Sequence, residues 1–188
     1  MTTGEAKVGL DRWILFWSIA LGGTTFDLVT KSLIFARVGA PPSRPVTIIP
    51  RILELHTSQN TGALWGIGAS LPYSSQIFAG LSVIAAVVIC YWLFVRGAAS
   101  SAILTVALGL VMAGAIGNCY DRLAFGHVRD FVHFHVDAVG FDCAIFNFAD
   151  NMLVAGSAAL VLYALRPEPI SPSETSEPAE TAETRALV

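Results

Sequence analysis

The feature that most constrains this chain is a long stretch with almost no charge. The 66 residues between Glu54 and Asp121 contain one Lys, Arg, Asp or Glu side chain, Arg96, and residues 62–95 contain none. Over the whole chain of 188 residues only 13% are charged, whereas a soluble domain carries about 25%. A bilayer requires about 20 predominantly apolar residues for each spanning helix. We therefore expect an integral membrane protein.

Four segments are apolar enough and long enough to be spans, which predicts a mainly α-helical membrane domain over residues 1–165. The expected spans are residues 12–35, 75–95, 98–118 and 146–165. The first span is not expected to be a cleaved signal peptide, because Asp27 and Lys31 interrupt its end and no small-residue cleavage site follows its apolar run. Only a few residues around Arg96 and Gly97 separate the second and third spans, so these two should form a tight helical hairpin.

Two polar segments between the spans, residues 37–71 and 120–144, should lie on the same side of the membrane. An even number of spans places both of them opposite the two termini. The alternating residues of "VTIIPRILELH" (46–56) predict short strands in the first segment, and nearby glycines mark turns. Lys and Arg flank both faces, so their distribution does not decide which face is cytoplasmic.

The last residues, 166–188, are rich in Pro, Ser, Thr and Glu, and we expect them to be disordered. They hold five Glu and two Arg, which gives −3 and equals the net charge of the whole chain. The charge balance therefore gives no indication of a nucleic-acid partner. The three cysteines have no CxxC spacing, so no disulfide framework is expected.

Polar side chains gather at one end of the predicted spans. Asp27 and Lys31 are four residues apart, so they share a helix face and can form an ion pair. The other members lie at the ends of spans three and four or in the adjoining polar segments. They are Asn60, Asn118, Asp121, Arg122, Asp130, Asn147 and Asp150. Polar residues placed for separate structural reasons would not all collect at one membrane face, so their gathering indicates a site.

Several of these residues also have structural interpretations. Asp27 and Lys31 can be a positioning ion pair, because buried charges are usually paired. Asp121 can brace the loop that follows its helix. His133, His135 and Asp137 alternate along a predicted strand and would share a face, which could hold a metal ion or simply be a hydrated strand face. We favour the hydrated face and expect no metal.

Asp130 and Asp150 are the candidate catalytic pair. Two carboxyl groups brought together near the bilayer surface do not both ionise easily, so one can keep a proton while the other acts as base on a water molecule. This pairing would explain why a membrane helix tolerates Asp150. Two other classes stay open on residue spacing alone, a small transporter and a metalloenzyme that uses the histidines, and Asp121 could replace Asp130 in the pair.

Five motifs occur in an order that resembles the lipoprotein signal peptidase family (signal peptidase II). They are "DLVTK" (27–31), "QNTGALWG" (59–66), "AGAIGNCYDR" (113–122), "GHVRDF" (126–131) and "FNFAD" (146–150). The resemblance covers about residues 13–165. Five ordered motifs are far more specific than any one of them.

The resemblance implies an aspartic endopeptidase with Asp130 and Asp150 as its catalytic residues and with no cofactor. It also implies a fold of four transmembrane helices with a small extracytoplasmic β-cradle. The residues expected to bind substrate or support the site are Asp27, Lys31, Asn60, Gly62, Asn118, Asp121, Arg122, Asn147 and Ala149.

The resemblance further implies the substrate and the location. The enzyme would remove the signal peptide from bacterial prolipoproteins, cleaving on the N-terminal side of a diacylglyceryl-modified cysteine. It would lie in the cytoplasmic (inner) membrane with both termini in the cytoplasm and its site near the outer leaflet. Its partners would be the signal peptide, the lipidated cysteine and membrane lipid, and we expect a monomer.

Overall fold

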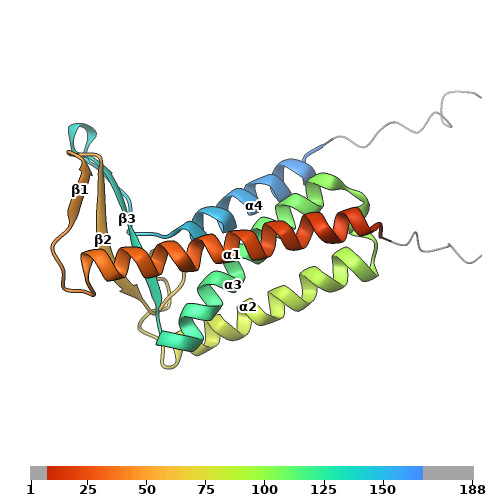
Figure 1. The fold of residues 1–188 in the computed structure, drawn as a ribbon, viewed down its shortest axis with the longest axis horizontal. Coiled ribbons are helices and arrows are strands. Elements are labelled where there is room, and N and C mark those ends of the chain that lie inside the picture. The colour runs from red at the N-terminus through yellow and green to blue at the C-terminus, as the bar shows by residue number, and fades with distance from the viewer. Residues whose placement is uncertain (1–7, 167–188) are drawn as a thin grey trace, which may run out of the picture.

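The computed structural model describes residues 8–166 (Figure 1), so the predicted disorder of the tail concerns residues that lie almost entirely outside it. Within this range the chain is mostly helical, with one small sheet. The α-helices are α1 (Leu10–Val38), α2 (Ser74–Cys90), α3 (Ala102–Phe125) and α4 (Phe148–Ala164). The strands are β1 (Val46–Ile49), β2 (Leu53–Asn60), β3 (Val128–Val136) and β4 (Phe141–Asp142). Short helical turns are η1 (Leu64–Gly66), η2 (Tyr91–Val95), η3 (Ala98–Ser100) and η4 (Asp137–Val139).

Three helical segments within residues 8–166 are long and apolar enough to cross a membrane: α1, α2 continued by η2, and α3. They correspond to the first three predicted spans. The fourth predicted span corresponds to α4, which is apolar but has 17 residues. A helix of this length extends about 26 Å, slightly less than the roughly 30 Å thickness of a bilayer core.

Helix α3 is the centre of the bundle, because α1, α2 and α4 all pack against it. Small residues at the contacts allow this close packing: a Cβ added at Gly156 of α4 would lie 2.7 Å from the carbonyl oxygen of Ala107 in α3. Phe16, Leu93, Leu108 and Met112 belong to the buried apolar core. The buried charged residues lie instead at the end of the bundle that meets the sheet.

The third predicted span needs correction at both ends. Helix α3 begins at Ala102 rather than at residue 98, because Ser101 caps it by accepting a hydrogen bond from the Leu104 N–H at 3.4 Å. The helix continues through Phe125 and ends at Gly126, which has a positive φ of 77°. Asp121 and Arg122 therefore lie inside a helix instead of in the following polar segment.

The four strands form one antiparallel sheet in the order β1-β2-β3-β4. The sheet stands at the end of the bundle opposite to the beginning of α1 and the end of α4 (Figure 1). Strands β1 and β2 confirm the prediction from alternating residues. Strand β3 follows α3 after a turn of two residues and leads by way of β4 to α4, so the sheet meets the helices at the start of α4.

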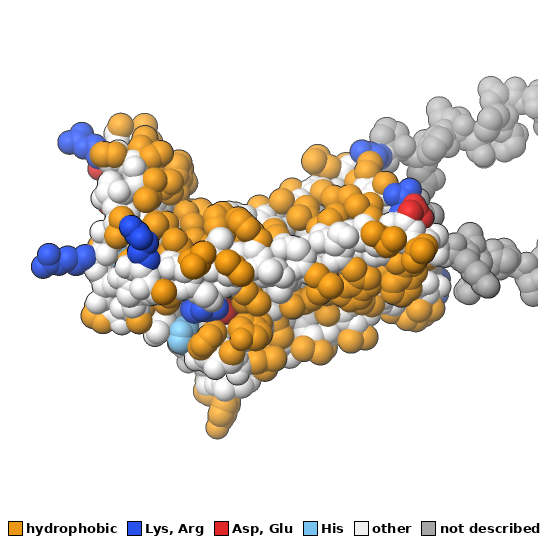
Figure 2. Space-filling view, in the orientation of Figure 1, with side chains coloured by type: hydrophobic (Ala, Val, Ile, Leu, Met, Phe, Trp, Pro, Cys, Tyr) orange, Lys and Arg blue, Asp and Glu red, His pale blue; other side chains and the backbone are white. Residues whose placement is uncertain are grey.

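The molecular surface agrees with placement in a bilayer. Figure 2 shows hydrophobic side chains spread over the helical bundle, with the visible Lys and Arg side chains near its two ends. Many large apolar side chains on the helices are exposed; Leu33, Val87 and Leu162 are each more than 60% exposed. Such a surface is suited to lipid rather than to water.

Candidate active site

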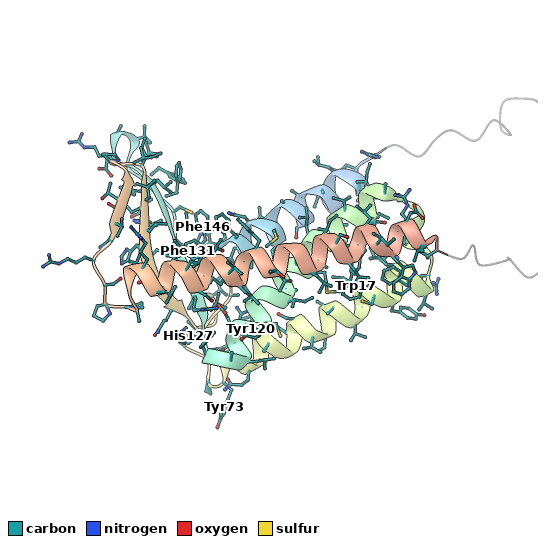
Figure 3. All side chains as sticks on the ribbon, in the orientation of Figure 1. Trp17, Tyr73, Tyr120, His127, Phe131 and Phe146 are labelled. Atoms are coloured by element: carbon teal, nitrogen blue, oxygen red, sulfur yellow. The ribbon has the colours of Figure 1, made fainter. Side chains whose placement is uncertain are left out.

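Asp130 and Asp150 reach the site from different elements. Asp130 lies on β3 and is buried, with 2% of its surface exposed. Asp150 lies in the first turn of α4, where it lines an apolar cavity. The backbone of β3 is joined to the residues before α4, because the N–H groups of Phe131 and Val132 both donate to the carbonyl oxygen of Phe146. Figure 3 labels Phe131 and Phe146 where β3 meets the bundle.

Asn147 connects the two aspartates. It is the N-cap of α4 and forms a capping box with Asp150, since its Oδ1 accepts from the Asp150 N–H at 3.0 Å and its own N–H donates to Asp150 Oδ2 at 3.2 Å. Its Nδ2 donates to Asp130 Oδ1 at 2.6 Å. One buried residue therefore holds both carboxyl groups, Asp130 through its side chain and Asp150 through its backbone N–H.

Asn118 and Lys31 continue this network from α3 and α1. Asn118 Nδ2 donates to Asp150 Oδ1 at 2.8 Å. Asn118 Oδ1 accepts from Lys31 Nζ at 2.9 Å and from Asn147 Nδ2 at 3.2 Å. The two donors to Oδ1 fix the orientation of the Asn118 amide, so that its Nδ2 points toward Asp150.

Asp27 forms with Lys31 the ion pair that their spacing predicts. Asp27 Oδ2 lies 2.7 Å from Lys31 Nζ, and both side chains are fully buried. Asp27 Oδ1 accepts from the Ala149 N–H at 2.8 Å, which is an otherwise unpaired donor in the first turn of α4. Gly117 makes room for this carboxylate, since a Cβ there would lie 2.6 Å from Asp27 Oδ2. Asp27 thus attaches the start of α4 to α1.

Asp121, the alternative candidate for the catalytic pair, is bound by basic side chains instead of by the other aspartates. Its carboxylate accepts from the Arg129 N–H at 3.0 Å and from Arg129 Nη2 at 2.8 Å, and it lies 3.3 Å from Lys31 Nζ. These contacts join the end of α3 to the start of β3. Arg129 is a site residue that the sequence motifs did not indicate, although it stands directly before Asp130 in "GHVRDF".

Asn60, Gly62 and Arg122 hold the loop after β2 over the site. Asn60 Oδ1 accepts from the Gly62 N–H at 2.9 Å, and Arg122 Nη2 donates to the Gly62 carbonyl oxygen at 2.8 Å. Gly62 packs closely against the returning chain, since a Cβ would lie 2.6 Å from the carbonyl oxygen of Ile67. These three predicted residues therefore meet at the rim of the site.

The environment of Asp130 favours its protonated form. Burial raises the pKa of Asp130 to about 7, with a further upward contribution from the charge of Asp150, while the hydrogen bond from Asn147 acts in the opposite direction. At neutral pH a large fraction of Asp130 therefore carries a proton. A carboxyl group in this state can act as a general acid.

A cavity of about 530 Å³ extends from Asp150 between α2, α3 and α4, and Asp130 lines a separate cavity of about 290 Å³. Asn118, Arg122 and Asp150 form part of its polar end, whereas Leu81, Leu153 and other apolar residues line the rest. A ligand with one polar reactive group and long apolar parts fits this distribution.

Comparisons with known proteins agree with this site. The family model "Signal peptidase (SPase) II" matches residues 19–166. A lipoprotein signal peptidase of Rhodopirellula baltica is 37% identical, over 81% of this chain and 72% of that protein. One from Staphylococcus aureus is 32% identical, over 79% and 86%. A solved structure described as a bacterial membrane enzyme, at 1.9 Å resolution, superposes with a TM-score of 0.71 and 30% identity, covering 87% of this chain and 99% of that one.

The fold and these matches define a bacterial membrane protease. The chain belongs to the signal peptidase II family, which confirms the resemblance found in its motifs. Family membership also decides between the classes left open by residue spacing, in favour of a protease and against a transporter.

Proposed function

We propose that this protein removes signal peptides from bacterial prolipoproteins, cleaving the bond before a diacylglyceryl-modified cysteine, with Asp130 and Asp150 as the catalytic pair. The observation that carries the proposal is the hydrogen-bonded chain from Asp130 through Asn147 to Asp150, which lies at the polar end of an apolar cavity. The relatives named lipoprotein signal peptidase support the choice of substrate.

The two carboxyl groups have different roles in the proposed reaction. Asp130 begins protonated, in keeping with its raised pKa. Asp150 begins ionised, because Asn118 Nδ2, the Asn147 N–H and the N-terminus of α4 all favour a negative charge there. The proton nevertheless belongs to the coupled pair rather than to one residue alone.

In the first step, Asp150 accepts a proton from water while the water oxygen attacks the scissile carbonyl carbon. Asp130 donates its proton to the carbonyl oxygen, which gives a neutral tetrahedral intermediate. In the second step Asp150 gives its proton to the leaving nitrogen and Asp130 takes one back from a hydroxyl group. The C–N bond breaks, and the pair returns to its starting state. General acid–base catalysis of this kind contributes roughly 10²–10⁴-fold.

Other site residues position this pair, and one of them retains an unpaired donor among the described residues. Lys31 and Asp27 fix Asn118 and the start of α4. Arg122 lines the cavity, and its Nε has no partner among the described residues. We assign Arg122 the role of binding a substrate carbonyl oxygen near the scissile bond.

Helix lengths support the proposed position of the site within the membrane. Counting 1.5 Å per residue, Asn118 lies about 24 Å from the start of α3 and Asp150 about 21 Å from the end of α4. In a bilayer core of about 30 Å these residues lie in the half distant from the termini. We propose that α4 is the fourth span, that both termini are cytoplasmic, and that the site is in the outer leaflet of the inner membrane. A signal helix and acyl chains could then enter the cavity laterally.

The test uses the purified full-length protein in detergent with two precursors, one carrying the diacylglyceryl group and one not. We expect cleavage directly before the modified cysteine and little cleavage of the unmodified precursor. EDTA should leave the rate unchanged, since the proposed chemistry requires only carboxyl groups. A folded protein that cleaves neither precursor would contradict the proposed function.

A further inference from the structure

A second cluster of ligand-type side chains lies on the sheet, apart from the aspartate pair. Glu54 on β2 and His133 and His135 on β3 each offer one atom, and these three atoms lie within 4.8 Å of one another. All three residues are partly buried. None of them takes part in the proposed proteolytic mechanism.

The strand register brings these side chains together. Glu54 and His133 are directly opposite each other in the antiparallel pairing of β2 with β3. His133 and His135 are two residues apart on β3, so they project from the same face, and their rings stack with centroids 4.9 Å apart. Asp137, which the sequence predicted on this face, lies instead in η4 because β3 ends at Val136. Glu54 is the carboxylate of the cluster.

The hydrogen bonds of the two rings leave one free nitrogen on each. His133 Nε2 lies 2.7 Å from Asp142 Oδ1, and His135 Nδ1 lies 2.9 Å from Asp137 Oδ1. Carboxylates accept hydrogen bonds, so a neutral ring places its proton on the nitrogen that faces the carboxylate. The lone pairs are then on His133 Nδ1 and His135 Nε2. Both of these nitrogens are buried and have no hydrogen-bond partner within residues 8–166.

Glu54 is oriented toward the same point. Its Oε1 accepts a hydrogen bond from Thr47 Oγ1 on β1 at 3.2 Å. Its Oε2 lies 4.0 Å from His133 Nδ1. A carboxylate oxygen and two imidazole lone pairs therefore converge, and each imidazole is supported from behind by another carboxylate. Histidines that ligate metals commonly have this supporting carboxylate, which sets the tautomer and the direction of the ring.

We propose that Glu54, His133 and His135 bind a divalent transition-metal cation such as Zn²⁺, with water as the fourth ligand. Imidazole nitrogens select such metals, whereas Mg²⁺ and Ca²⁺ prefer oxygen ligands. In a tetrahedral site with bonds of 2.0–2.1 Å, ligand atoms lie about 3.3 Å apart. The separation of His133 Nδ1 and Glu54 Oε2 therefore has to shorten by less than about 1 Å on binding.

The proposed metal would stabilise the sheet and leave the proteolytic chemistry unchanged. Residues 133 and 135 alternate with residue 130 on β3, so the histidines project from the opposite face to Asp130. The cation would join β2 to β3, the strand that carries Asp130. Binding to the folded state alone would raise the melting temperature of the protein.

The experiment is a calorimetric titration of the untagged full-length protein in detergent with ZnCl₂, with MgCl₂ as the comparison. We expect one Zn²⁺ per chain and an increase in melting temperature, and neither with Mg²⁺. His133→Gln and His135→Gln should each abolish both effects, and Asp142→Asn should weaken binding about 10–100-fold. His127→Gln, a histidine outside the cluster, is the matched control and should bind like wild type.

Each variant is checked for folding by its cleavage of the lipidated precursor, or by its melting temperature in EDTA if the peptidase proposal fails. The metal proposal and the peptidase proposal can therefore fail independently. Wild-type protein that binds no Zn²⁺ would overturn the metal proposal. So would folded His133→Gln and His135→Gln variants that bind Zn²⁺ with wild-type affinity.

Discussion

The Nδ2 atom of Asn147 lies 2.6 Å from Oδ1 of Asp130, although the two residues belong to different elements. Asn147 is also the N-cap of α4 and bonds Asp150 through its backbone and its side chain. A single residue therefore determines both the start of a membrane helix and the relative position of the two proposed catalytic groups. A suitable substitution at Asn147 can therefore separate its effect on the stability of the protein from its effect on the position of Asp130.

We predict that Asn147→Ser and Asn147→Ala both lose activity but differ in stability. Serine also caps helices, whereas alanine does not, and loss of a cap costs about 1 kcal/mol. Neither side chain can reach Asp130 as the amide does. Cleavage rates should fall for both variants, and thermal melts should show the larger loss for Asn147→Ala. An Asn147→Ser variant with wild-type kcat would contradict the positioning role.

The raised pKa of Asp130 predicts that stability and activity decline together as the pH rises. The pKa in the folded protein is about 7, against an ordinary value of 3.8. The stabilising contribution of protonated Asp130 is therefore fully present below pH 3.8 and is lost as the pH rises through about 7. Activity that depends on protonated Asp130 should decline over the same upper range.

Asp130→Asn should remove the loss of stability that accompanies ionisation of the buried Asp130 carboxyl group at high pH. At pH 8 we expect the variant to be inactive yet at least as stable as wild type, and the difference in melting temperature should grow between pH 6 and pH 8. Melts and cleavage rates measured across this range provide the check. A variant that is less stable than wild type at pH 8 would show that Asp130 is not a destabilising buried charge.

Unlike Asp130→Asn, the variant Asp121→Asn should be less stable than wild type. The Asp121 carboxylate neutralises buried Arg129, so its removal leaves that guanidinium without compensation. Lys31, by contrast, keeps Asp27 as its partner. Breaking a buried ion pair in this way costs about 3–5 kcal/mol. We expect a large fall in melting temperature, with residual activity in the fraction that is folded. A stable but inactive Asp121→Asn would move Asp121 into the catalytic pair.

Gly117→Ala tests the packing of α3 against the site. The added Cβ would lie 2.6 Å from Asp27 Oδ2, so the carboxylate that holds Ala149 must move. Overpacking of this kind costs about 1–3 kcal/mol, and a displacement of about 1 Å at the start of α4 can lower the rate about 100-fold. The control is Gly80→Ala on α2, where an added Cβ meets nothing within 4 Å; it should retain wild-type melting and cleavage.

The helices and the two strands of the first polar segment could be predicted because their signals are local. Absence of charge marks α2, and alternating residues mark β1 and β2. The end of α3 could not be located in this way, because Asp121 and Arg122 suggest a helix end. They remain helical because their side chains face Lys31, Arg129 and the loop at Gly62 instead of lipid.

The contacts between site residues could be predicted less well than the residues themselves. The motifs indicated Asn118, Asn147 and both aspartates, but not that the Asn147 amide joins Asp130 to the Asn118 network. The partnership of Asp121 with Arg129 and that of Glu54 with the histidines depend on how α3, β2 and β3 meet. Spacing along one element cannot supply these relationships.

The most direct test of the catalytic pair is the cleavage rate of a diacylglyceryl-modified prolipoprotein by wild type, Asp130→Asn and Asp150→Asn. Asp11→Asn, at the exposed start of α1, is the matched control. We predict that both site variants lose at least about 10²-fold in rate while a thermal melt shows that they are folded, and that Asp11→Asn keeps wild-type activity. Substantial cleavage by either folded site variant would contradict the assignment of Asp130 and Asp150 as the catalytic pair.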